Sequence, residues 1–344
     1  MRLPGNRGLP VCALWLAVCG IPASAATPHA PSTSATSVAP RTPATGSVAA
    51  SAAPIPPARL IASYEPCYGR VAGQRGTIVI RRIVMADGTQ KWLTVNTATL
   101  ATAIVPAAGL RTQFDVDPTS LEGSASPKAL DSLDDGSNYF ALRREIADNY
   151  PRYRHGVSSH GGQGYMVTCD LCPSSRPLDR DFVEILSAHG VSPIYVCISG
   201  KWIERHEADL QWLLALKTPR ILWVNHSLIH YYKPGAPDSV NFLNRPGTDL
   251  RREVLDNERL MVERGLTPTV FFRYPGLVSS PEVARAVLGW GLIPLGADAW
   301  LAKGERPRSG GIILVHINGN EPLGLKLLRE WLPTTKMKAE EFLR

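Results

Sequence analysis

Short apolar runs alternate with amphipathic segments through the second half of the chain. The apolar runs, which have the length of strands, lie at residues 164–170, 192–199, 220–227, 267–275, 292–300 and 310–317. The segments between them repeat apolar positions with a helical period at residues 179–190, 201–217, 248–265 and 280–291. This alternation predicts an α/β fold, with a parallel sheet or barrel that carries helices on its outside.

A different pattern precedes this one. Residues 27–58 are almost wholly Ala, Pro, Ser and Thr, which predicts a flexible linker, because so little apolar surface does not offset the entropy of ordering. From Arg59, apolar and polar residues alternate on both sides of Asp87 and Gly88, a pattern that predicts a β-hairpin. A loop at 111–137 and a helix at 139–150 complete the expected N-terminal region.

The first 25 residues have the features of a secretory signal peptide. Arg2 and Arg7 precede an apolar run at residues 11–21, and an Ala-x-Ala cleavage pattern ends at Ala25. We therefore expect a periplasmic or secreted protein. A lipid anchor at Cys19, within a lipobox-like stretch, is the alternative, and only in that case do we expect membrane attachment. The predicted domains are the signal peptide 1–25, the linker 26–58, the β-hairpin and helix region 59–150, and the main domain 151–344.

Signal cleavage would leave Cys67, Cys169, Cys172 and Cys197 in an oxidising compartment. Their pairing does not follow from the sequence. Cys169 and Cys172 are candidates for a redox pair, and Cys169 and Cys197 lie on consecutive predicted strands, where a disulfide is the rival. We favour structural roles, because Asp170 between the sulfurs would raise a thiol pKa.

The charge of the chain changes this picture little. The formal net charge is +7, but Lys and Arg are scattered, and no basic block is interleaved with aromatic residues. We therefore expect no nucleic-acid partner.

Polar side chains close the predicted strands, at the edge where α/β folds place their chemistry. These residues are Asp170, Asn225, His226 with His230, Arg273, Asp298 and His316. Their segregation to strand ends predicts an active site there.

Two histidines suggest a metal. His226 and His230 are four residues apart, so one helical turn would place both imidazoles on one face, as in zinc sites. The alternative is one capping histidine and one packed against Tyr231 and Tyr232. Two ligands are also fewer than the three or four that a zinc site requires.

The other strand-end residues have catalytic and structural interpretations. Asp170 is either a general base or the N-cap of the following helix. Arg273, after an apolar strand, needs a carboxylate partner, and Asp170 is available. His316 is either a catalytic histidine, whose second ring nitrogen Asp298 would hold and whose basicity Asp298 would raise, or a buried histidine bonded to a carbonyl.

Taken in order, these segments resemble the polysaccharide deacetylase family, the NodB-homology group of carbohydrate esterase family 4. VTCDLCPSS resembles its Thr-Phe-Asp-Asp motif, and NHSLIH matches its His-Ser/Thr-x-x-His motif. FFRYPG resembles its Arg-x-Pro motif, GADAW its acidic-tryptophan motif, and IILVH its Leu-x-His motif. The resemblance covers about residues 160 to 320.

The resemblance implies a distorted (β/α) barrel, complete or incomplete, that hydrolyses acetyl groups on a polysaccharide or peptidoglycan-type glycan. It implies a divalent metal ion, zinc first and cobalt or nickel as alternatives, bound by His226 and His230. Asp170 would be the base, Arg273 would orient it, and His316 would protonate the leaving amine while Asp298 tunes its pKa.

The sequence departs from the family pattern in three places. Leu171 replaces a metal-ligating aspartate, so Asp170, Cys172 or another residue would have to complete the site. Gly276 follows Pro275 directly, where the family has an aromatic residue before its glycine. Residues 331–344 read as a helix, so the last strand is missing, and the barrel is incomplete or closed by the N-terminal β element.

Two other functions compete with this one. A non-catalytic carbohydrate-binding relative would keep the groove without hydrolysis. A periplasmic thiol oxidoreductase would use Cys169 and Cys172.

Overall fold

The computed structural model describes residues 61–108, 112–113, 126–335, 337, 339 and 341–342. The predicted signal peptide, the linker and the possible lipid anchor at Cys19 lie outside the described residues. Among the residues that the structure describes, no helix combines the length and apolar character needed to cross a bilayer.

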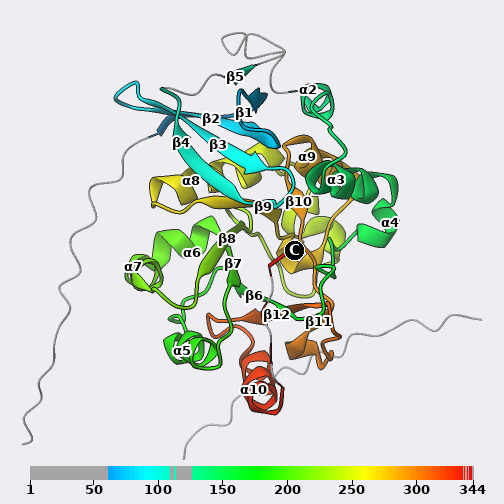
Figure 1. Ribbon diagram of the computed structural model, residues 1–344. Helices are drawn as coiled ribbons and strands as arrows, with labels where there is room; N and C mark the ends of the chain where they lie inside the picture. The colour runs from blue at the N-terminus through cyan, green and yellow to red at the C-terminus, as the bar shows by residue number, and fades with distance from the viewer. Residues whose placement is uncertain are drawn as a thin grey trace, which may run out of the picture. The chain divides into compact units, whose positions relative to one another are not determined.

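The predicted strands form one parallel sheet of seven strands in the order β10-β9-β8-β7-β6-β12-β11 (Figure 1). The predicted strand at 292–300 is interrupted at Gly296, where the backbone of residues 155–156 comes too close for a side chain. The strands are β6 (Met166–Leu171), β7 (Ile194–Ile198), β8 (Ile221–Asn225), β9 (Pro268–Phe272), β10 (Ile293–Pro294), β11 (Ala299–Trp300) and β12 (Ile312–His316).

The helices between the strands follow the predicted pattern, with local differences. The predicted helix 201–217 is divided at His206 into α6 and α7, and the helical segment within 248–265 contains a π-helix, η3, near its start. The bounds are α5 (Arg180–Ala188), α6 (Gly200–Arg205), α7 (Glu207–Ala215), η3 (Arg252–Asp256), α8 (Asn257–Glu263), α9 (Pro281–Gly289) and α10 (Pro322–Trp331). Short 3₁₀ turns are η1 (Asp238–Val240), η2 (Phe242–Asn244), η4 (Pro275–Leu277), η5 (Leu301–Lys303) and η6 (Leu332–Thr334).

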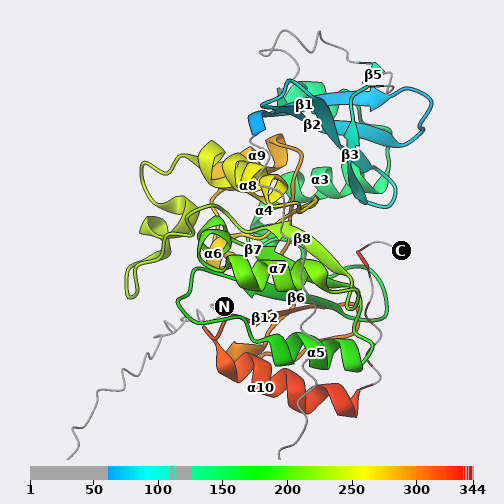
Figure 2. The ribbon, with the colours of Figure 1, turned by 90° about the vertical axis from the view of Figure 1, so that its left-hand side faces the viewer.

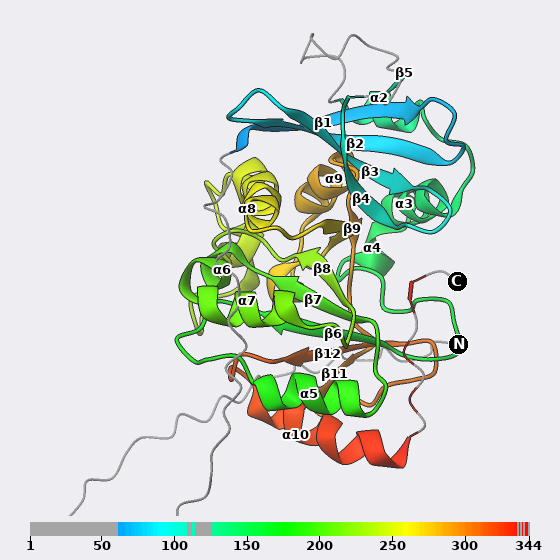
Figure 3. The ribbon, with the colours of Figure 1, turned by 60° about the vertical axis from the view of Figure 1, so that its left-hand side comes forward.

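The helix predicted for residues 331–344 is wrong for the described residues of that range. Helix α10 ends at Trp331, where that helix was expected to begin, and a 3₁₀ turn containing Pro333 follows. Proline lacks the amide hydrogen and clashes with the preceding turn, so it cannot continue an α-helix. Helices α10 and α5 lie side by side beneath β6 and β12 (Figures 2 and 3).

Side chains alternate between the two faces of the parallel sheet. Val167, Cys169 and Leu171 of β6 belong to a buried cluster that includes apolar residues of α5, α7 and α10. Asp170, between them, points to the opposite face, as the period of two requires. The strand therefore fixes one face for packing and one for the polar residues of its carboxyl end.

The N-terminal region forms a separate antiparallel sheet in the order β4-β3-β2-β1-β5. The predicted hairpin around Asp87 and Gly88 is present between β2 and β3. The strands are β1 (Ile61–Val71), β2 (Thr77–Met85), β3 (Gln90–Asn96), β4 (Thr102–Pro106) and β5 (Thr112–Gln113), and the helices are α2 (Pro127–Asp131), α3 (Asn138–Asp148) and α4 (Tyr150–Tyr153). The segment 111–137 thus contains β5 and α2 as well as loop.

This second sheet lies over helices α8 and α9 rather than between the end strands of the parallel sheet (Figure 2). Arg81 of β2 forms an ion pair with Glu258 of α8 at 2.8 Å, and both side chains are fully buried. Tyr68 of β1 donates a hydrogen bond to the Gly289 carbonyl of α9. The described parallel sheet is therefore an open, curled half-barrel.

Candidate active site

Two of the predicted site residues are neighbours across adjacent strands. His316 of β12 lies opposite Asp170 of β6 in the parallel register, and both are buried at the carboxyl ends of their strands. Asp170 is also opposite Cys197 of β7. Asp170 caps no helix among the described residues, because the N-cap of α5 is Asp179, whose carboxylate accepts from the Phe182 amide.

Arg273 lies beside Asp170, as the sequence predicted. Its side chain is fully buried, with Nη1 4.0 Å from Asp170 Oδ2, and its Nη2 donates to Thr168 Oγ1 at 2.7 Å. Burial alone would raise the pKa of Asp170, but Arg273, His226 and His316 together lower it below its usual value. Asp170 Oδ1 is buried and has no hydrogen-bond partner among the described residues, so it remains available as an acceptor.

The two histidines of the His-Ser/Thr-x-x-His motif come together without a helical turn. Residues 226–230 form a loop in which Ser227 and His230 have positive φ angles of 66° and 53°. The imidazole centroids of His226 and His230 are 4.7 Å apart. The helical turn that was predicted to place both imidazoles on one face is thus replaced by a strained loop. Such a backbone conformation persists only where the surrounding residues hold it.

The π-helix η3 holds this loop. The Leu228 amide donates to the Glu253 carbonyl at 2.8 Å, and the Ile229 amide donates to the Glu253 carboxylate at 2.9 Å. Asn225 Nδ2 donates to the Val254 carbonyl at 2.8 Å. π-helical turns are rare and are often found at functional sites, because they free backbone groups from the regular ladder.

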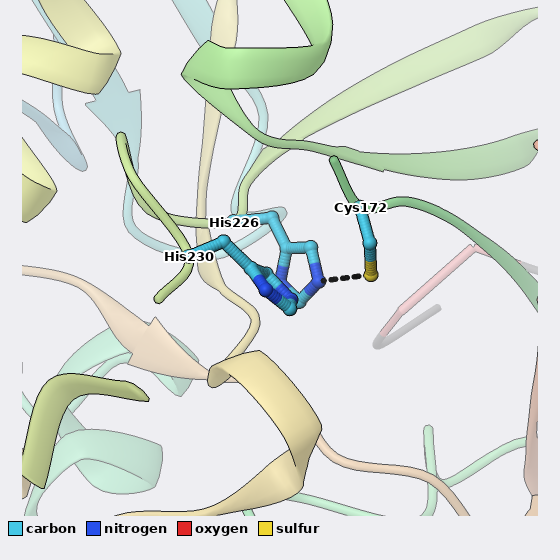
Figure 4. A group of neighbouring side chains, drawn as sticks. All are labelled: Cys172, His226 and His230. Atoms are coloured by element: carbon cyan, nitrogen blue, oxygen red, sulfur yellow. Dashed lines mark hydrogen bonds between the residues drawn. The ribbon is translucent and has the colours of Figure 1, made fainter. Parts of the chain in front are cut away.

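Cys172 joins the two histidines. Its Sγ is 3.4 Å from His226 Nε2, and one donor atom from each of Cys172, His226 and His230 lies within 4.8 Å of the others (Figure 4). Figure 4 shows the thiol and the two imidazoles directed toward one another. Leu171, which replaces the aspartate of the family motif, is fully buried on the other face of the sheet.

The donor set fits a divalent metal ion such as zinc. Zinc bound to a thiolate and an imidazole at ordinary lengths places the two donor atoms about 3.6 Å apart in a tetrahedral site. The observed sulfur to nitrogen distance is 3.4 Å. His226 Nδ1 is 2.9 Å from the Arg273 carbonyl, which leaves Nε2 facing the cluster, and His230 Nε2 is buried without a partner among the described residues.

The surroundings also favour the forms of these side chains that bind metals. Burial lowers the pKa of His226 to about 4, so the imidazole is neutral. Burial alone would raise the pKa of Cys172, but His230 and His316 lower it to about 7. A neutral imidazole and a thiolate are the forms that coordinate a metal.

Glu321, rather than Asp298, contacts His316. The Glu321 carboxylate lies 2.8 Å from His316 Nδ1 and accepts a hydrogen bond of 2.6 Å from the indole of Trp300. Burial alone would lower the pKa of His316, but Cys172 and Glu321 raise it well above its usual value.

Asp298 is engaged elsewhere. It accepts hydrogen bonds from the Arg308 backbone amide at 2.9 Å and from Arg308 Nε at 2.8 Å. Its carboxylate therefore orders the loop before β12. Reasoning from the sequence missed Glu321, because it follows a short turn after β12 and lies at no predicted strand end.

Cys169 and Cys197 are buried in the parallel sheet. Cys169 pairs in register with Val196, and Cys197 pairs with Asp170, so the two sulfurs project from opposite faces. Neither they nor Cys172 form a disulfide. The structure therefore supports neither the Cys169 to Cys197 disulfide nor a redox pair of Cys169 with Cys172.

No protein-family model matches the chain. Among solved structures, a family 4 carbohydrate esterase from Bacillus anthracis is similar at 18% identity, over 60% of this chain and 89% of that chain, with a TM-score of 0.43. A family 4 carbohydrate esterase from Streptomyces lividans, in complex with acetate, is similar at 17% identity over 53% and 94%, with a TM-score of 0.38. A CE4 family pseudoenzyme from Bacillus anthracis is similar at 14% identity over 52% and 63%, with a TM-score of 0.37. The chain is thus similar to family 4 carbohydrate esterases, and these proteins include a pseudoenzyme.

Proposed function

We propose that this protein is a secreted or periplasmic, metal-dependent deacetylase that removes acetyl groups from the nitrogen of an amino-sugar polymer. One observation carries the proposal: Cys172, His226 and His230 gather three donor atoms within 4.8 Å, beside the buried pair of Asp170 and His316.

Cys172, His226 and His230 would hold the metal and leave a fourth position open, as catalytic zinc sites do. A bound divalent ion supplies Lewis acidity, which acidifies water and polarises a carbonyl group. A thiolate is a soft ligand, so this donor set favours zinc or cobalt over magnesium or calcium. Cys172 would thereby replace, as the third ligand, the aspartate that the family has at the position of Leu171.

Asp170 would accept the proton of the attacking water. Its Oδ1 is buried and without a partner among the described residues, while its Oδ2 lies near Arg273 and 3.7 Å from His226 Nε2. Arg273 is itself fixed by Thr168, and its positive charge stands 4.0 Å from the carboxylate. A base fixed within reach of the reacting water is the geometric requirement for general base catalysis.

His316 would give a proton to the leaving amine. Its imidazole is hydrogen-bonded to the Cys172 thiol, and its Nδ1 lies 2.8 Å from the Glu321 carboxylate. The indole of Trp300 fixes the same carboxylate from a second direction. Glu321 is therefore a positioning residue for the acid.

A non-catalytic carbohydrate-binding protein is the second candidate. The observation that favours it is Leu171, which is fully buried among apolar residues and supplies no ligand. In this case Cys172 and the histidines would be a remnant of a site, and glycan binding would not depend on metal.

The experiment is acetate release from N-acetylglucosamine oligomers and from peptidoglycan by the purified chain. It compares added zinc, added cobalt and chelator, and it includes His226→Ala, with His189→Ala as the matched control. His189 is an exposed histidine at the end of α5. We expect release that requires metal, that His226→Ala abolishes and that His189→Ala preserves.

Other outcomes are equally informative. Release that survives chelator but is lost in Cys172→Ala would replace the metal with a cysteine nucleophile. A folded protein that binds the oligomers equally with added metal and with chelator, and releases no acetate under any metal, would establish the second candidate.

A further inference from the structure

An exposed aromatic ring, that of Tyr232, lies directly after residues 226–230, the loop that carries His226 and His230 and is called the metal loop below. Among the described residues, the large apolar side chains that are well exposed are Tyr232 at 47%, Val240 at 38% and Leu323 at 50%. Two of these three belong to residues 231–245, directly after His230. Tyr232 and Val240 thus expose apolar surface on the segment that follows the candidate metal ligands.

Tyr232 is linked to the metal loop through the ring of Phe242. Its ring is parallel to Phe242, with centroids 5.2 Å apart and an interplanar angle of 10°. Phe242 in turn contacts His230 edge-on, with centroids 5.5 Å apart. One face of Tyr232 is thus covered by Phe242, and its exposed area belongs to the remainder of the ring.

The loop that carries Tyr232 is held rigidly. The side chain of Asn241 is buried, accepts from the Lys233 amide at 2.7 Å and donates to the Ala236 carbonyl at 3.0 Å. Phe242 lies directly over Gly276, where an added Cβ would come within 2.5 Å of the Phe242 ring. Phe242 therefore provides an aromatic wall over this glycine, and Tyr232 is preorganised on top of it.

The aromatic side chain on the other side of the site is already occupied. The Trp300 ring carries the Lys303 ammonium 3.5 Å from its centroid, and its indole nitrogen is bound to Glu321. Among the described residues, Tyr232 is therefore an aromatic residue beside the site that offers an exposed ring to a ligand.

We propose that Tyr232 stacks on a pyranose ring of the glycan chain, one that neighbours the sugar whose acetyl group reaches the metal centre. A pyranose presents a flat face of C–H groups with hydroxyl groups at its rim, which matches a flat aromatic ring in a polar loop. The inference rests on the proposed function, which supplies the glycan substrate. It assigns to Tyr232 the preference of the protein for oligomers over single sugars.

The test is the affinity of the purified chain for an N-acetylglucosamine tetramer and for the methyl glycoside of the monomer, by calorimetry in chelator. Removing the metal prevents hydrolysis during the titration. We expect Tyr232→Ala to weaken tetramer binding by about three- to tenfold, the size of one aromatic contact. Tyr232→Phe, which keeps the ring, should retain tetramer affinity, and neither variant should alter monomer binding.

Three results would overturn the inference: unchanged tetramer affinity in Tyr232→Ala, equal losses for tetramer and monomer, or a wild-type chain that does not prefer the tetramer. Circular dichroism of each variant separates these results from misfolding. A failed deacetylase is distinguishable, because the tetramer preference would then persist without acetate release under any metal.

Discussion

Glu258 of α8 is the counter-ion of Arg81, and its replacement by glutamine would test how firmly the N-terminal sheet is fixed to the main domain. Both side chains are fully buried, and the carboxylate accepts from Arg81 Nε at 2.8 Å and Nη2 at 3.3 Å. Tyr64 also donates to it at 3.2 Å. In Glu258→Gln the guanidinium stays buried, but its charge is no longer compensated.

Breaking a buried ion pair by removing one partner costs about 3–5 kcal/mol, because the remaining charge has neither water nor a counter-ion. We expect Glu258→Gln to lower the free energy of unfolding by this amount. The double variant Arg81→Leu with Glu258→Leu should recover part of the loss, since it removes both charges together. Recovery is partial because Arg81 also donates to the Trp290 carbonyl, at 2.6 Å.

Urea unfolding followed by far-ultraviolet circular dichroism measures these changes. The matched control is Glu330→Gln, which removes an ion pair with Lys326 whose side chains are 60% and 69% exposed. That pair is screened by water, so stability should hardly change. A decrease in the free energy of unfolding of less than about 1 kcal/mol in Glu258→Gln would refute the reasoning, because a buried unpaired charge destabilises a protein by more than that.

Two further predictions concern the site. Cys172→Ala should weaken zinc binding by at least about 100-fold in a competition titration, because loss of a ligand exceeds the effect of losing a residue that only supports a ligand. Cys172→Asp should bind zinc again, but its cobalt form should lack the sulfur-to-cobalt charge-transfer band of the wild type. A band that persists in Cys172→Asp would exclude the Cys172 thiolate as a ligand. Glu321→Gln should lower kcat at least about tenfold with little change in KM, because His316 loses the carboxylate at its Nδ1. Arg308→Ala, which frees Asp298, should leave kcat within about twofold. A larger loss of kcat in Arg308→Ala than in Glu321→Gln would return Asp298 to the role that the sequence predicted.

The sequence was informative where local periodicity decides structure. Apolar runs of strand length placed Asp170 and His316 at strand ends, and parallel strands bring such ends to one edge of a sheet. Their position at one edge of the sheet therefore followed from the pattern, whereas their adjacency in register comes from the strand order, which the pattern does not give.

The rest of the site depends on contacts between segments far apart in the chain, which local patterns do not encode. The loop that brings His226 and His230 together is not helical, because Glu253 fixes its backbone from a different element. Arg81 and Glu258 are 177 residues apart, and no pattern around either one identifies the other. Cys172 was one of several candidates to replace Leu171, and only the direction of its side chain distinguishes it.

The π-turn at Arg252–Asp256 makes the length of this segment a condition for the whole site. A π-turn holds one more residue than the α-helical turn it replaces, so it is equivalent to a single-residue insertion. Deleting one residue there would give a regular helix and leave α8 in place, because the π-turn already absorbs the extra residue. The Glu253 and Val254 carbonyls, which accept from the Leu228 amide and from Asn225 Nδ2, would then return to the regular hydrogen-bond ladder of the helix. One surplus residue in a helix thus supplies the acceptors that hold the histidine loop.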